Sequence, residues 1–229
     1  MYSIGAVTAA GRAVVPDASS VPAAVASGEA DPLVVEGPAL SLRYAVPADA
    51  ERLLELGGDP AVTRFFSWGP YTDLAQPRAY IAELPGRRAR GEQLDFVVVH
   101  RDDGPIGVTG LSELSHRDRR ATTGSWLGHR WWGTGANFEA KALLAALAFG
   151  PLGLERLTAT ASTRNGRSQV ALERIGFRRE GVLAAWHRHG GTAHDVVVFG
   201  LLRAAWERSG LRAVPVQVSG TPPAAFVVE

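Results

Sequence analysis

The chain of 229 residues contains no cysteine, which excludes disulfide bonds, thiolate metal sites and a cysteine nucleophile. It also lacks any uninterrupted run of about 18 apolar residues, so we expect no membrane-spanning helix and no membrane partner. The first thirty residues have neither the basic start nor the apolar stretch of a signal peptide. These absences are compatible with a cytoplasmic enzyme, and we expect that location.

The sequence also lacks a large excess of either positive or negative charge. The 24 basic and 23 acidic residues give a formal net charge of +1, so no global field attracts nucleic acid, and we expect none as a partner. Any anion site must therefore be local. Only one of the 24 basic residues, Lys141, is a lysine, a skew that we attribute to coding composition rather than to chemistry.

The remaining composition, with 46% hydrophobic and 21% charged residues, is that of an ordinary globular protein. Residues 1–32 have no helical or strand period, and we interpret them as an N-terminal extension. A Ser-Gly pair and three later prolines predict a C-terminal tail over residues 209–229. The expected domain spans residues 33–208.

Hydrophobic periodicity within this domain predicts a mixed α/β fold, in which an antiparallel meander leads into alternating strands and helices. The predicted strands lie at residues 40–44, 96–100, 106–111, 122–127, 157–161, 177–186 and 196–202. The predicted helices lie at residues 47–56, 137–149 and 168–175, with a proline-interrupted helical region at 72–90.

The sharpest local feature is Arg130-Trp131-Trp132-Gly133-Thr134-Gly135-Ala136, between a predicted strand and an Ala/Leu-rich helix. Glycines there allow a tight turn that brings unpaired N–H groups of a helix N-terminus against an anion, and Arg130 adds a cation. A pyrophosphate fits this description. The motif is not a Rossmann fingerprint, because Phe138 replaces the third glycine, nor a Walker loop, because Gly-Lys-Ser/Thr is absent. A tight turn without a ligand is the alternative.

From about residue 33 to residue 206 the chain resembles the GNAT superfamily of acetyl-CoA-dependent N-acetyltransferases, in particular the RimJ/RimL-type ribosomal-protein N-terminal acetyltransferases. Arg130-x-x-Gly133-x-Gly135 matches the Arg/Gln-x-x-Gly-x-Gly/Ala pyrophosphate loop, and residues 132–140 match the longer version of this branch. Downstream, residues 164–177 resemble its Asn-x-x-Ser…Glu-Lys-Leu-Gly-Phe stretch. Two long motifs in the family order and spacing carry the resemblance.

The resemblance implies a GNAT fold, an α/β (α+β) architecture whose twisted, mostly antiparallel sheet splays in a V with helices on both faces. Acetyl-CoA, as co-substrate and without a metal, would lie in the split before the strand at residues 157–161. The implied chemistry is direct acetyl transfer to a primary amine, either a protein N-terminus or a small molecule, and a homodimer is left open. The implied CoA-binding residues are Arg130, Trp132, Gly133, Thr134, Gly135, Ala136, Asn165 and Ser168.

Two departures from the family pattern affect the mechanism. Leu172 replaces the tyrosine general acid of many members, which shifts the task of hydrogen-bonding or protonating the departing thiolate to Ser168. Thr122 replaces the glutamate of an Ala-Glu-Ile-Gly pattern, and Glu113 in the preceding strand is the first candidate for the missing base. The second choice is a histidine near the final hairpin: His187, His189 or His194.

The sequence leaves several alternatives open. Asn165 is either a donor to the pantetheine arm or a helix N-cap, and Ser168 is either catalytic or a surface serine. The missing tyrosine and glutamate also support a rival class, a GNAT-like module that binds acyl-CoA without transferring it. Four tryptophans near strand ends either line an acceptor cleft or, as we favour, pack in the core: Trp126, Trp131, Trp132 and Trp186.

Overall fold

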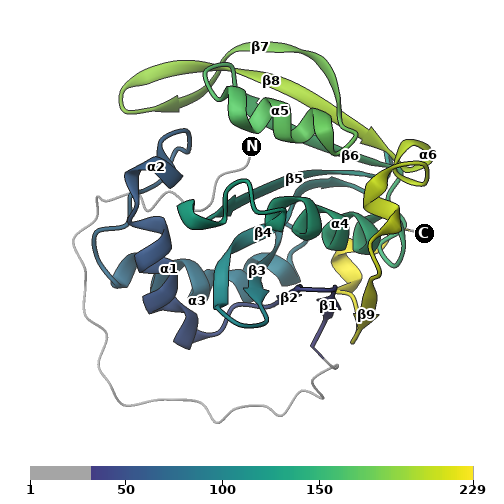
Figure 1. The fold of residues 1–229 in the computed structure, drawn as a ribbon, viewed down its shortest axis with the longest axis horizontal. Helices are drawn as coiled ribbons and strands as arrows, with labels where there is room; N and C mark the ends of the chain where they lie inside the picture. Colours follow the sequence, from purple (N-terminus) through teal and green to yellow (C-terminus); the bar gives the residue numbers. More distant parts are fainter. Residues whose placement is uncertain (1–31, 229) are drawn as a thin grey trace.

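The computed structural model describes residues 32–228, which form a nine-stranded sheet flanked by helices (Figure 1). Apart from its last residue, the extension expected over residues 1–32 lies outside the described residues. The strands are β1 (Val34–Glu36), β2 (Leu40–Arg43), β3 (Gln93–His100), β4 (Gly104–Ser115), β5 (Arg120–Leu127), β6 (Arg156–Ser162), β7 (Arg178–His189), β8 (Thr192–Leu202) and β9 (Gln217–Ser219). The α-helices are α1 (Ala50–Gly57), α2 (Pro60–Thr63), α3 (Ala75–Ala89), α4 (Ala136–Phe149), α5 (Gly166–Arg174) and α6 (Arg203–Trp206).

The order of strands in the sheet is β7-β8-β6-β5-β4-β3-β2-β1-β9, and all neighbours are antiparallel except β5 and β6. These two strands pair in parallel only between residues 120–122 and residues 156–158. Beyond these residues the ladder ends and the sheet opens into a V. The predicted fold class and the predicted position of the split are thereby confirmed.

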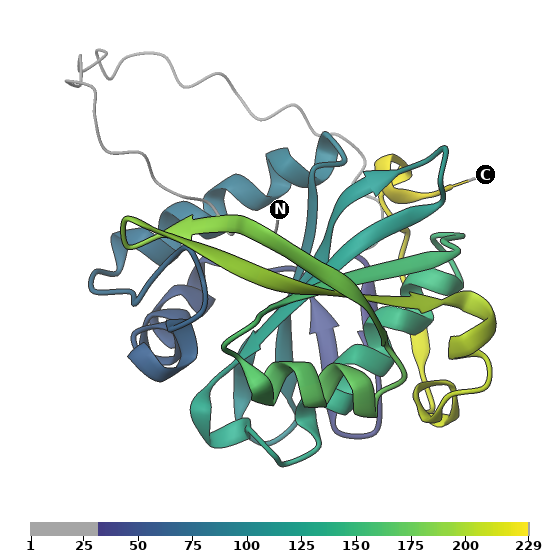
Figure 2. The ribbon, with the colours of Figure 1, turned by 90° about the horizontal axis from the view of Figure 1, so that it is seen from above.

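Helices cover both faces of the sheet, as the two hydrophobic clusters show (Figure 2). The larger cluster lies between α4 and the sheet, and the smaller one contains side chains of α1 and α3. Neighbouring residues of β5, Trp126 and Leu127, belong to different clusters because successive side chains of a strand point to opposite faces. Side chains on β5 can therefore face α4 only at alternate positions.

Local sequence explains where the two helices beside the split begin. Gly135 precedes α4 with a φ of 94°, in the left-handed region that favours glycine, and the Ala- and Leu-rich sequence after it favours a helix. Asn165 precedes α5, and its side-chain Oδ1 accepts a hydrogen bond from the backbone N of Ser168. This is a standard N-cap, which satisfies one of the free N–H groups of the first turn.

The long hairpin of β7 and β8 extends beyond the rest of the sheet, and its tip lies near α2 in both views (Figures 1 and 2). The chain therefore brings the tip of the β7–β8 hairpin and α2 to the same side of the molecule. Within residues 32–228, no helix combines the length and apolar character needed to cross a membrane.

The segment expected as a C-terminal tail packs against the sheet. β9 pairs with β1 at the sheet edge, and the Phe226 side chain is completely buried. The backbone N of Val228 also donates a hydrogen bond to the carbonyl oxygen of Leu152, at 2.9 Å. The division of the chain at residue 209 stays a prediction, but the residues that follow contribute to the core.

Candidate active site

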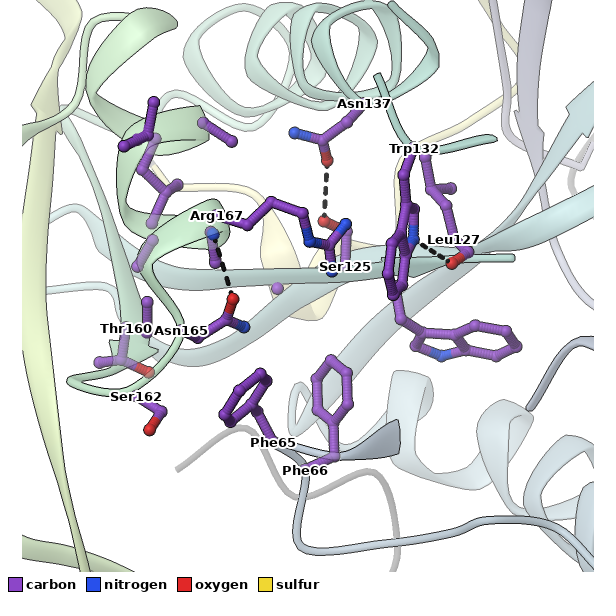
Figure 3. Close-up of a pocket in the computed structure, with 18 of the residues that line it drawn as sticks. Phe65, Phe66, Ser125, Leu127, Trp132, Asn137, Thr160, Ser162, Asn165 and Arg167 are labelled. Carbon is purple, nitrogen blue, oxygen red and sulfur yellow. Dashed lines mark hydrogen bonds between the residues drawn. The ribbon is translucent and has the colours of Figure 1, made fainter. Parts of the chain in front are cut away.

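The open end of the V holds a pocket with a cavity volume of about 520 Å³ (Figure 3). Residues 123–127 of β5 and residues 159–162 of β6 line it, and these are the parts of both strands that lie beyond their pairing. The remaining lining comes from residues 131–133, the first turns of α4, the helix α5 with its N-cap, His187 of β7, and α2 with the segment after it. The pocket is thus a direct consequence of the split in the sheet.

The glycine turn before α4 borders this pocket. Gly133 and Gly135 have φ values of 77° and 94°, and a Cβ atom built at either position meets no described atom within 4 Å. The Ala136 N–H donates to Thr134 Oγ1 at 3.4 Å. The N–H groups of Asn137 and Phe138 have no carbonyl partner within the helix, so they are available to an anion. The turn therefore combines open space with backbone donors.

The loop residues do not all face the same cavity. Trp132 and Gly133 line the pocket in the V, whereas Thr134, Gly135 and Ala136 line a second cavity of about 650 Å³. The hydroxyl of Thr134 donates a hydrogen bond to the carbonyl oxygen of Trp131 at 2.9 Å, which holds the turn together. A ligand that follows the loop would therefore pass from one cavity toward the other.

Arg130 lines neither cavity. Its Nη2 donates to Asp103 Oδ1 at 2.6 Å, and its side chain is 64% exposed. Exposed ion pairs of this kind contribute little, about 0 to 1 kcal/mol, so an anionic ligand can compete for the guanidinium. The role of Arg130 in CoA binding stays a prediction.

Arg167 of α5 reaches across the pocket toward Trp132 (Figure 3). The guanidinium carbon lies 3.3 Å from the centre of the Trp132 ring, and Trp132 Nε1 donates to the carbonyl oxygen of Leu127 at 2.9 Å. Burial lowers the pKa of Arg167, although an arginine stays charged at any physiological pH. This stack places a positive charge between α5 and the glycine turn.

Asn165, the N-cap of α5, and Ser168, in the first turn of this helix, are predicted to contact CoA, and both line the pocket. The N-cap bond uses Oδ1 of Asn165, so its Nδ2 group is the part of the side chain that can donate to a ligand. Ser168 is half-buried beside it. The structure therefore brings these residues to the side of the pocket opposite β5, while their roles toward CoA stay predictions.

Two polar pairs join β5 to α4 inside the pocket. Lys141 Nζ donates to Thr123 Oγ1 at 3.0 Å, and the Ser125 hydroxyl donates to Asn137 Oδ1 at 3.4 Å. All four residues line the pocket. Burial lowers the pKa of Lys141 to about 7.

The predicted base Glu113 lies elsewhere. It is exposed at an irregularity of β4, with a φ of 51°, and its Oε2 accepts a hydrogen bond from Thr122 Oγ1 at 2.8 Å. Glu113, the candidate base, is thus hydrogen-bonded to Thr122, the residue for which it would substitute, but neither residue lines the pocket. His187 does line it, and burial lowers the pKa of this histidine below its usual value. The role of Glu113 as base stays a prediction.

Aromatic and aliphatic side chains line the pocket on the side of α2. Val62, Phe65 and Phe66 come from α2 and the segment after it, and Trp126 comes from β5. Trp126 and Trp131 are both buried and both line the pocket, so each of them packs in the core and also lines the cleft. Trp186 is 45% exposed and belongs to neither.

Among residues 32–228, no aspartate or glutamate lines the pocket. Its ionisable side chains are basic ones: Lys141, Arg167, Arg174 and His187. Within residues 32–228, no three histidine or carboxylate side chains gather where they could hold a metal ion.

Sequence reasoning missed the polar pairs and the apolar side of the pocket. A usable signal was present in α4, because Asn137 and Lys141 are four residues apart and so share one helix face. A lysine within an otherwise Ala- and Leu-rich segment indicates a buried polar contact. Phe65 and Phe66 carried no such signal, since only the fold brings the segment after α2 to the pocket.

A splayed sheet, a glycine turn at a helix N-terminus and a pocket between them define an acyl-CoA-dependent transferase. The chain belongs to the GNAT acetyltransferase family, because the sequence profile of the acetyltransferase (GNAT) domain matches residues 39–178. It is accordingly an acetyl-CoA-dependent N-acetyltransferase that uses an amine acceptor. The family predicted from the motifs is confirmed, and family membership does not favour a non-catalytic module.

Individual proteins agree with this assignment. The chain is 32% identical over 165 residues to the uncharacterised N-acetyltransferase p20 of Bacillus licheniformis, covering 72% of this chain and 93% of that protein. It is 28% identical over 172 residues to the Bacillus subtilis (strain 168) protein named "Putative ribosomal N-acetyltransferase YdaF", covering 73% and 93%. The crystal structure of the microcin C7 self-immunity acetyltransferase MccE with acetyl-CoA and AMP shares the fold, with a TM-score of 0.65, 21% identity, and coverage of 72% and 92%.

Proposed function

We propose that the pocket in the V transfers an acetyl group directly from acetyl-CoA to a primary amine, without an acyl-enzyme intermediate. The observation that carries this proposal is the continuous lining from Gly133 at the glycine turn to Phe65 and Phe66 near α2. The thioester of acetyl-CoA, bound from the side of the glycine turn, meets an acceptor that enters from the side of α2. The solved structure of MccE with acetyl-CoA supports this use of the fold.

The pyrophosphate of CoA binds at the glycine turn and the first turn of α4. Backbone N–H groups, the helix dipole and the nearby guanidinium of Arg167 all favour negative charge there. The pantetheine arm then runs between β5 and β6, where both strands have unpaired edges, and Asn165 Nδ2 donates to it.

The reaction follows from this placement. A neutral amine attacks the thioester carbonyl, a backbone N–H of β5 steadies the developing oxyanion, and the C–S bond then breaks. Ser168 donates a hydrogen bond to the departing sulfur. Direct transfer suits a chain that contains no cysteine nucleophile.

His187 is the base that the pocket favours. Its lowered pKa keeps the imidazole neutral at pH 7, so it can accept the proton of the acceptor, directly or through one water. Glu113 is less favoured as the base, because neither it nor its hydrogen-bond partner Thr122 lines the pocket.

The acceptor that fits best is an α-amino group of a peptide or protein. In the described part of the chain no carboxylate lines the pocket to hold an ammonium ion, so an amine that is already largely neutral is preferred. An α-amino group has a pKa of about 7.7 to 8.0, against about 10.4 for an alkylammonium. The name of the B. subtilis relative, a ribosomal N-acetyltransferase, supports the same choice. Apolar contact with Phe65 and Phe66 favours an uncharged first side chain.

An acceptor screen tests this function. Purified protein is incubated with acetyl-CoA and with pairs of amines that share a side chain, one a peptide with a free α-amino group and one an alkylamine. We expect thiol release with the peptides and at least 10-fold less with the alkylamines at pH 7. Acetyl-CoA binding without thiol release from any amine would instead favour the sensor module.

The location, partners and oligomeric state expected from the sequence are compatible with this function. The enzyme acts in the cytoplasm on acceptors that are neither nucleic acid nor membrane. A homodimer would leave the chemistry of a single pocket unchanged.

A further inference from the structure

Lys141 is the only lysine of the chain, and it lies where a lysine is costly. It is 5% exposed in the middle of α4, on the face that contacts β5, and it also lines the pocket of the V. Its Nζ donates to Thr123 Oγ1 at 3.0 Å. Thr123 directly follows the last β5 residue that pairs with β6, so the amine lies at the point where the V opens.

No negative charge of residues 32–228 compensates the positive charge of Lys141 in the pocket. Among the described residues, the other charged or titratable groups of the pocket are Arg167 and Arg174 from α5 and His187 from β7, and β5 and β6 contribute only neutral side chains to it. No carboxylate within the described residues forms an ion pair with Nζ. Burial alone therefore lowers the pKa of this amine to about 7.

We propose that Lys141 is a catalytic acid, which gives its proton to the sulfur of CoA as the thioester bond breaks. The inference rests on the proposed function, because it requires acetyl-CoA in this pocket. Lys141 and Asn137 project from the same helix that opens with the glycine turn, so they lie along the CoA side of the pocket. His187 and the phenylalanines near α2 form the acceptor side.

The step balances in atoms and electrons. The nitrogen of the acceptor forms a bond to the acetyl carbon, and the carbon–sulfur bond breaks with its electron pair on sulfur. The ammonium of Lys141 donates one proton to that sulfur and becomes a neutral amine, while the acceptor gives one proton to His187 or water. Solvent reprotonates Lys141 before the next turnover, so the products are an acetylated amine and CoA thiol.

Lys141 and Ser168 then have different tasks. A serine hydroxyl can hydrogen-bond a thiolate but does not release its proton near pH 7. An ammonium group with a pKa of about 7 is a stronger acid than an alkyl thiol, whose pKa is about 8.5, so it can transfer its proton to the thiolate sulfur. This assignment supplies the proton donor that is missing at Leu172.

The first test uses the uniqueness of Lys141. Protein grown with lysine labelled with ¹³C at Cε gives one ε-methylene signal, and its chemical shift is followed from pH 5 to pH 11. We expect a titration midpoint near pH 7 in the free enzyme. A midpoint above about 10, the value of an exposed lysine, would overturn the proposal.

The second test is kinetic. Lys141→Met keeps the length of the side chain without an ionisable group, and Arg208→Met is a matched control at an exposed position outside the pocket. We expect Lys141→Met to lower kcat by about 100-fold or more with little change in the Kd of acetyl-CoA, and to abolish the fall of kcat as pH rises through about 7. Lys141→Arg should not restore turnover, because a guanidinium does not release its proton.

The outcomes separate the two proposals. Wild-type turnover and an unchanged pH profile in Lys141→Met, in a protein that binds acetyl-CoA, would overturn the role of Lys141 alone. If the wild-type protein releases no CoA with any amine, the proposed function fails, and the role of Lys141 fails with it.

Discussion

The protonation state of a pocket side chain depends on the groups that contact it, and Lys141 is the clearest case. Its ammonium is buried against one hydroxyl, so the folded protein favours the neutral amine. An unfolded lysine has a pKa of about 10.4. The unfolded chain therefore binds more protons than the folded chain between about pH 7 and pH 10.4, and stability rises with pH in this window.

This linkage gives a stability prediction. Lys141→Met should raise the free energy of unfolding relative to the wild type, because it removes a buried charge that costs free energy. The gain should be full below pH 7, shrink as pH rises and vanish above about pH 10.4. Urea unfolding at pH 6, 8 and 10 measures it. A destabilised variant at pH 6 would show that the amine is favourably paired.

Ser168 gives a second prediction at this scale. Ser168→Ala should lower kcat while the Kd of acetyl-CoA stays within about two-fold, because its hydrogen bond strengthens only as negative charge develops on sulfur. We expect a loss of about 10-fold, smaller than for Lys141→Met, since Ser168 does not give up its proton. Steady-state kinetics and calorimetry measure the two quantities. Unchanged kcat would make Ser168 an ordinary residue of α5.

Among the elements, α5 depends on an N-cap residue, Asn165, that has two separable roles. Asn165 caps the helix through Oδ1, and we assign its Nδ2 to the pantetheine arm. An aspartate retains the acceptor and loses the donor, whereas an alanine loses both.

Asn165→Asp and Asn165→Ala therefore form a matched pair. Asn165→Ala should destabilise the protein by about 1 kcal/mol and weaken acetyl-CoA binding. Asn165→Asp should keep wild-type stability and still weaken acetyl-CoA binding by several-fold. Thermal unfolding and calorimetry distinguish these effects. Wild-type affinity in Asn165→Asp would reduce Asn165 to a helix cap.

The elements also show what the sequence could and could not predict. The glycine turn and the α5 cap depend on short-range backbone chemistry, so Gly133, Gly135 and Asn165 were identifiable from local spacing. β1 and β9 have three residues each, too few to show a period of two, and their pairing depends on a contact between the two ends of the described chain. Glu113 was identified from the sequence only as a substitute for Thr122. The hydrogen bond between the two residues, at an irregularity of β4 and outside the pocket lining, depends on the pairing of β4 and β5.

At the scale of the whole molecule, the segment after residue 209 helps to close the core. Phe226 is fully buried in the larger cluster, far along the chain from the α4 and β2 residues of the same cluster. The predicted tail had prolines and no periodicity, and such a segment can still bury one large side chain. Contacts of this kind are invisible to a local sequence pattern.

Phe226→Ala should therefore lower the free energy of unfolding by about 3 to 5 kcal/mol, because it removes a buried ring and leaves a cavity. Chemical denaturation gives this value directly. Phe65→Ala, a change of the same type in the pocket lining, is the control and should cost much less stability, because Phe65 is half-exposed. A loss below about 1 kcal/mol for Phe226→Ala would mean that this segment is peripheral.

The most direct measurement of the central claim is the stoichiometry and kinetic pattern of the wild-type reaction. Thiol release is recorded while acetyl-CoA and a peptide with a free α-amino group are varied together, and mass spectrometry counts the acetylated peptide. Direct transfer in the V predicts one acetylated amine for each CoA released and double-reciprocal lines that intersect. Parallel lines, or CoA released without an equal amount of acetylated amine, would contradict it.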